Sequence, residues 1–171
     1  MHWYALKVFF NKVFEMEGKL KALGIETYVP VVVVEKMVKG ERTYVQKPAI
    51  SSLLFLCTTA EQAEALLEVI EGKAMFYRNR GSKHPTAIRD REMNIFKKVT
   101  SAHKEGLEYF DGNVAKFCTG QRVRVIEGTF QGCEGYIHRI KGNRRLIVAI
   151  EGLVAVATTY IPSPFLQPIS E

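Results

Sequence analysis

The stretch "GQRVRVIEGTFQGCEGYIHRIKGNRRLIVAIEG", from Gly120 to Gly152, decides the fold of the C-terminal part of the chain. It holds six of the chain's thirteen glycines, which separate short runs of valine, isoleucine and arginine. Short apolar runs separated by glycine turns are typical of small β-barrels. We predict a small SH3-like β-barrel over residues 119–171, with strands in the runs Val123–Ile126, Tyr136–Ile140, Leu146–Ile150 and Val154–Tyr160.

Glycine has a physical role in so small a barrel. The strands must bend sharply and the turns must be short. Glycine adopts positive φ and allows close backbone approach without steric cost. Gly128, Gly132 and Gly135 occupy the positions where these properties are needed.

Upstream of the barrel, patterns of strand and helix alternate. Alternating residues predict a strand at 2–8. A repeat of Val13, Met16, Leu20 and Leu23 predicts a helix that Asn11 caps, with Phe14 exposed beside the apolar stripe. Two β-rich runs flank "KGER", which predicts a hairpin turn built on Gly40.

The segments that follow complete the first domain. "SSLLFLCT" predicts a buried central strand, and a helix with Thr58 or Thr59 at its N-cap follows it. A short strand, "KAMFYRN", and a helix in "RDREMNIFKKVTSAHKE" come next. This order predicts an α+β fold, an antiparallel sheet with packed helices over residues 1–105. Residues 106–118 are expected to form a linker to the barrel.

Composition and motifs argue against catalysis. The four histidines (His2, His84, His103 and His138) lie at no metal-ligand spacing, the three cysteines form no CxxC, and no phosphate-binding glycine loop occurs. We therefore expect no enzyme activity, metal or cofactor. No run of eighteen apolar residues and no signal peptide occurs, so we expect a soluble cytoplasmic protein, a monomer without membrane contact.

Positive charge is concentrated in one segment. The chain carries a net charge of +6, and the segment from Lys73 to Lys98 alone has eight basic residues against two acidic ones. Such a local excess suits a polyanion such as nucleic acid, and the alternative is a solvated helix face with a basic loop. The candidate nucleic-acid-binding residues are Arg78, Arg80, Lys83, Arg89 and Arg91.

Two motifs together resemble the NusG family. "GQRVRVIEGTFQGCEGYIHRI" resembles the KOW motif, a pattern that ribosomal proteins share with transcription elongation factors. "HWYALKV", "LKALGIETYVP", "KPAISSLLFL" and "TAIRDREM" resemble the NGN domain in the same order. This pairing covers nearly the whole chain. It implies a transcription elongation or antitermination factor that docks on the clamp of RNA polymerase and recruits other partners through the KOW domain.

The resemblance also implies which residues meet the polymerase. Trp3 and Tyr4 point to opposite faces of their strand, so one of them is expected to line an apolar depression with Ile50 and Leu53; core packing is the alternative. Phe14 is expected to be a further exposed contact. The basic cluster is expected to touch the non-template DNA strand or nascent RNA.

The sequence departs from the family pattern in two places. The usual Phe-Pro-Gly-Tyr before the buried strand is replaced by the residues from Ile50 to Leu53. The Ile-Phe-Gly that grips a ribosomal protein in housekeeping members reads Ile150-Glu151-Gly152. A carboxylate at an apolar contact must be desolvated, so we expect a specialised paralog.

The expected KOW partner surface comprises Phe130, Ile150, Glu151 and Leu153. The alternative function is a ribosome-associated or RNA-binding KOW protein whose N-terminal domain merely resembles NGN.

Overall fold

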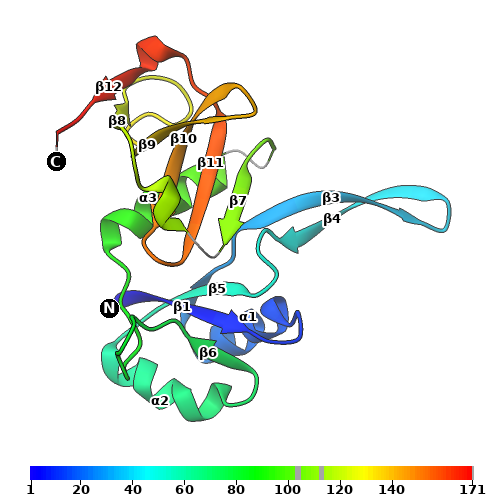
Figure 1. Ribbon diagram of the computed structural model, residues 1–171. Helices are drawn as coiled ribbons and strands as arrows, with labels where there is room; N and C mark the ends of the chain where they lie inside the picture. The colour runs from blue at the N-terminus through cyan, green and yellow to red at the C-terminus, as the bar shows by residue number, and fades with distance from the viewer. Residues whose placement is uncertain (103–104, 112–113, 171) are drawn as a thin grey trace. The chain divides into compact units, whose positions relative to one another are not determined.

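The computed structural model describes residues 1–102, 105–111 and 114–170. It divides into two compact units, Met1–Asp90 and Arg91–Glu171. The first combines sheet and helices, and the second is rich in strands (Figure 1). The α+β prediction is therefore confirmed.

The first unit is built on a four-stranded antiparallel sheet. Its strand order is β2-β5-β1-β6, with bounds β1 His2–Val8, β2 Glu26–Tyr28, β5 Leu53–Thr58 and β6 Ala74–Phe76. Strand β5 lies at the centre, as its continuous apolar run predicts. Helices α1 (Val13–Ala22) and α2 (Ala60–Ile70) pack their apolar sides onto one face of this sheet.

Strands β3 (Val31–Val38) and β4 (Glu41–Pro48) form a separate hairpin, a long two-stranded ribbon in Figure 1. Lys39 and Gly40 join them, with φ of 52° and 84°. Positive φ at both central residues is the signature of a type I′ turn, which matches the twist of paired strands. The predicted turn at Gly40 is confirmed.

Two details of the helices differ from the sequence prediction. Asn11 does not cap α1, because it has a positive φ of 55° and Lys12 occupies the N-cap without a side-chain hydrogen bond. Leu23 is 59% exposed because α1 ends at Ala22, one residue short of the expected stripe. For α2, the structure selects Thr59 as the N-cap, since its hydroxyl accepts the Gln62 N–H.

The second unit contains helix α3 (Asp90–Ala102, whose first residue belongs to the first unit) and a six-stranded sheet. The strand order is β12-β8-β9-β10-β11-β7. The four predicted strands are β8 (Arg122–Val125), β9 (Glu134–Ile140), β10 (Asn143–Ile150) and β11 (Val154–Tyr160). Strands β7 (Glu108–Asp111) and β12 (Leu166–Pro168) and the short helices η1 (Val114–Phe117) and η2 (Ser163–Phe165) complete it.

The segment expected to be a linker contributes to the second sheet. Strand β7 pairs antiparallel with β11, from Glu108 opposite Ala157 to Asp111 opposite Val154. Phe110 and Phe117 pack against the apolar cluster around Ile147. Positions 112–113 of that segment, and His103 and Lys104 at the end of the expected helix, lie outside the described residues. The ranges 1–105, 106–118 and 119–171 remain a prediction about independent folding.

Candidate functional site

The two faces of the first sheet separate the residues expected to bind polymerase. In the β1–β5 register Trp3 lies opposite Cys57, and Lys7 lies opposite Leu53. Because side chains alternate along a strand, Trp3 and Leu53 share one face, and Tyr4 points to the face covered by α1 and α2. Trp3 is therefore the aromatic residue that points away from the helix-covered core.

Exposure divides the same set in another way. Trp3, Tyr4 and Leu53 are 7%, 4% and 2% exposed. Phe14 is 44% exposed on α1, as its place beside the apolar stripe predicts, and Ile50 is partly buried just before β5. Phe14 and Ile50 are thus the accessible members of this set.

The basic cluster lies on a loop that is closed by its own hydrogen bonds. The Thr86 hydroxyl accepts the Asn79 N–H at 2.7 Å, and the Tyr77 carbonyl accepts the Thr86 N–H at 3.1 Å. Arg78, Arg80 and Lys83 are exposed on this loop, and the structure gives them no ion pair or hydrogen bond with the residues it describes. Their charges are therefore available to a polyanion.

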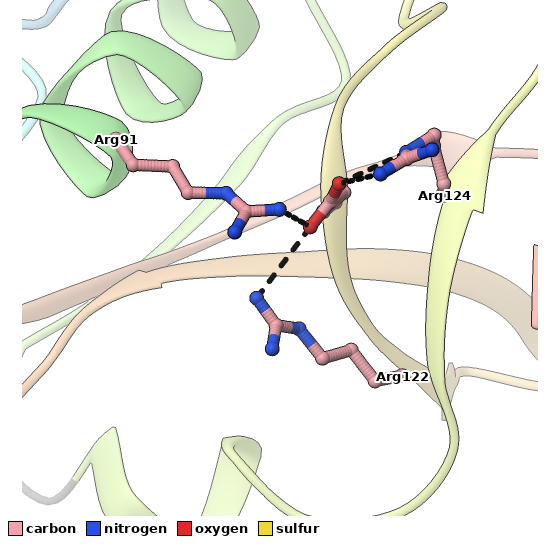
Figure 2. A network of polar contacts seen from close by, with 4 residues as sticks. Arg91, Arg122 and Arg124 are labelled. Atoms are coloured by element: carbon pink, nitrogen blue, oxygen red, sulfur yellow. Dashed lines mark hydrogen bonds and ion pairs between the residues drawn. The ribbon is translucent and has the colours of Figure 1, made fainter. Parts of the chain in front are cut away.

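Arg91 lies in a different environment from these three residues. Figure 2 shows its guanidinium against the carboxylate of Glu134 on β9, together with Arg122 and Arg124 from β8. Arg124 donates to Glu134 Oε1 from Nε at 2.9 Å and from Nη2 at 2.7 Å. Arg91 therefore joins α3 to the six-stranded sheet, and its exposed side chain is not a free cation like Arg80.

Glu134 is the carboxylate that holds this cluster together. Its side chain is only 5% exposed. Burial alone would raise the pKa of Glu134, but the Arg124 hydrogen bonds and the charges of the three arginines lower it below its ordinary value. Lys98 reinforces the same junction by donating to the Gln131 carbonyl.

Sequence reasoning missed Glu134. The sequence carries no clear signal, because the burial of the neighbouring Cys133 and Gly135 is seen only in the structure, and an acidic residue in a buried run needs a cationic partner.

The residues expected to bind a KOW partner are mostly core residues. Phe130, Ile150 and Leu153 are 5%, 2% and 9% exposed. Glu151 is exposed in the turn between β10 and β11, where the Leu153 N–H donates to the Ile150 carbonyl at 3.1 Å. Of the four, Glu151 is the exposed residue.

Within residues 1–102, 105–111 and 114–170, no group of three or more His, Cys, Asp or Glu side chains is arranged to hold a metal ion. None of the described helices is long and apolar enough to cross a membrane.

Comparison with known proteins identifies the family. Residues 1–97, more than half of the chain, match the family described as transcription termination factor nusG. The chain belongs to the NusG family. It is also similar to a solved structure on domain interaction in Thermotoga maritima NusG, with 18% identity over 99% of this chain and 97% of that one, at a TM-score of 0.48. No curated protein matches the sequence.

Membership of the NusG family makes the protein a transcription elongation or termination factor. The sheet of the second unit lies beyond the matched residues and is rich in strands, as the sequence predicts.

Proposed function

We propose that the protein is an elongation and antitermination factor that binds the clamp region of RNA polymerase through its N-terminal unit. The observation that carries this proposal is the NusG-family match over residues 1–97, which covers the whole N-terminal unit, Met1–Asp90. The candidate polymerase-binding residues are Trp3, Tyr4, Phe14, Ile50 and Leu53. We propose the accessible Phe14 and Ile50 as the direct contacts, because Trp3, Tyr4 and Leu53 are buried.

The basic loop supplies the proposed nucleic-acid contact. Arg78, Arg80 and Lys83 are exposed within six residues of one polar loop. Flexible cations on such a loop suit the phosphates of the non-template strand or of nascent RNA. Arg89 is exposed close by. Arg91 also belongs to the proposed set. Its ion pair with Glu134 reduces its expected contribution to nucleic-acid binding.

The second unit is proposed to recruit a further protein. Glu151 is the accessible residue of the expected surface, and Phe130, Ile150 and Leu153 shape the turn and core around it. An exposed carboxylate at this turn favours a partner other than one that takes an apolar anchor.

Affinity capture of the tagged full chain tests the proposal. We expect RNA polymerase subunits to be recovered, and Phe14→Ala with Ile50→Ala to weaken recovery about tenfold, since truncated apolar anchors cost binding energy. Val69→Ala, at a 55% exposed position on α2, is the matched control. Recovery of ribosomal subunits or rRNA without polymerase would support the alternative KOW function instead.

A further inference from the structure

One cavity of the N-terminal unit differs in its chemistry from the basic loop. It has a volume of about 290 Å³ and is lined by Tyr4 of β1, Glu61 and Glu64 of the first turns of α2, and His84. Two alanines and a proline complete its apolar wall. In a chain with a net charge of +6, this is a locally acidic hollow.

The Tyr4 hydroxyl is the unusual group in this cavity. Tyr4 is 4% exposed, and its ring lies edge-on to Phe76 at 6.0 Å. Among the described residues, the structure gives its hydroxyl no hydrogen-bond partner. The hydroxyl oxygen is not among the buried side-chain atoms that lack a partner, so it is accessible from the cavity and can bond to a group that enters there.

The two carboxylates around the hydroxyl indicate which kind of ligand group the cavity favours. Burial first, and then the negative charges of Glu61 and Glu64, raise the pKa of Tyr4, so both carboxylates act on this hydroxyl. Glu61 stays ionised at neutral pH, because hydrogen bonds from its own backbone N–H and from Thr59 lower its pKa. Glu64 accepts from His84 Nδ1 at 2.7 Å, with further acceptor capacity on its carboxylate.

We infer that this cavity binds an arginine side chain of a protein partner, held by the carboxylates of Glu61 and Glu64 and by the hydroxyl oxygen of Tyr4. A guanidinium has five donors and no acceptor, so it can satisfy all three oxygen groups at once. The apolar wall suits the methylene stem of arginine, and guanidinium is more weakly hydrated than an ammonium group. No three-ligand metal group occurs among the described residues, so a metal ion is disfavoured.

This inference goes beyond the proposed function, because it names the chemical group that the cavity takes and holds whichever protein supplies the arginine. Its test needs no polymerase. Failure of the peptide experiment therefore leaves the affinity-capture result untouched, and the reverse is also true.

The experiment titrates the isotope-labelled full chain with acetyl-Gly-Arg-Gly-amide and follows its amide resonances by NMR. We expect saturable shifts at Tyr4, Glu61, Glu64 and their neighbours, with a Kd on the order of 1 mM for a few charge-assisted hydrogen bonds. The same peptide with citrulline, which is neutral and nearly isosteric, should give no saturable shift. The lysine peptide should bind several-fold more weakly.

Three conservative variants assign the contacts. Glu61→Gln and Glu64→Gln remove a charge at constant shape, and Tyr4→Phe removes one oxygen; we expect each carboxylate variant to weaken binding about tenfold and Tyr4→Phe less. Glu41→Gln, which removes the same charge from exposed β4, is the control and should bind like the wild type. Unchanged spectra of the free variants would show that the fold is intact.

Three results would overturn the inference. One is equal binding of the citrulline or lysine peptide. Another is wild-type affinity in the Glu61→Gln, Glu64→Gln double variant. The third is the absence of saturable shifts at tens of millimolar peptide, an order of magnitude above the expected Kd.

Discussion

Glu134 on β9 holds side chains of α3 and β8 together, although α3 lies about forty residues earlier in the sequence. Its nearly buried carboxylate contacts guanidiniums of Arg91, Arg122 and Arg124, which come from α3 and β8. Removing one partner of a buried ionic cluster leaves the other charges without compensation. Glu134 therefore stabilises the junction between α3 and the six-stranded sheet.

We predict that Glu134→Gln destabilises the protein by about 2 kcal/mol at neutral pH, less than a fully buried pair would cost because the arginines are partly exposed. Arginine contacts lower the Glu134 pKa, so its stabilisation is present above the ordinary value of 4.5 and is lost as pH falls through the folded-state pKa. The difference from wild type, measured by urea unfolding between pH 7 and pH 3, should shrink below about pH 4.5.

Glu127→Gln provides the control, since Glu127 is exposed in the same unit, between β8 and β9. Its effect should stay near zero over the whole range. A pH-independent effect of Glu134→Gln would mean that packing, and not charge, explains the loss.

At the scale of elements, local signals predicted most strands and helices, and contacts distant in sequence explain the misses. Alternation and glycine turns are local, so β8 to β11 and the β3–β4 turn could be predicted. Strand β7 could not, because "EYFD" has little pattern of its own and becomes a strand by pairing with β11. The prediction that Asn11 caps α1 was wrong, because Asn11 has a left-handed backbone conformation before α1 begins.

Close approach of β9 and β10 gives the second prediction. A Cβ on Gly135 would lie 2.1 Å from the Ile147 carbonyl oxygen, a backbone atom that cannot move without shifting its strand. We predict that Gly135→Ala destabilises the protein by about 2–3 kcal/mol. Calorimetry of thermal unfolding measures this as a lowered transition temperature.

Gly18→Ala is the matched control for Gly135→Ala. Gly18 lies inside α1 with open space around its Cβ position, so alanine there should stabilise the protein by about 0.5–1 kcal/mol. Equal and small effects of both substitutions would contradict the close strand approach.

At the scale of the whole molecule, the fold divides the basic segment into cations with partners and cations without them among the described residues. The sequence shows the basic segment between Lys73 and Lys98, but it does not show which of these cations have a partner in the folded protein. Arg91 and Lys98 are used inside the second unit, by Glu134 and the Gln131 carbonyl, whereas the loop cations have no described partner. Sequence can count such charges, but only the fold decides which remain available, because neutralising partners come from distant strands.

The final prediction follows from the three available charges. Each phosphate contact releases counterions, so losing one should flatten the dependence of log affinity on log salt by roughly 0.7 for a single strand. Replacing Arg78, Arg80 and Lys83 together with alanine should therefore weaken binding of the full chain to a fork-bearing elongation complex and reduce its salt slope by about two. The measurement is a salt titration of the wild type and the variant, with and without the non-template strand.

The control removes three other exposed cations, Lys36, Lys47 and Arg139, so that net charge changes equally. A change in net charge alone would weaken long-range attraction to the complex in both triple variants, because screened charges act without regard to position. Direct phosphate contact predicts instead that the loop variant loses slope and the control keeps it. If the two variants have equal slopes when the strand is present, the loop is a solvated surface and the nucleic-acid assignment fails.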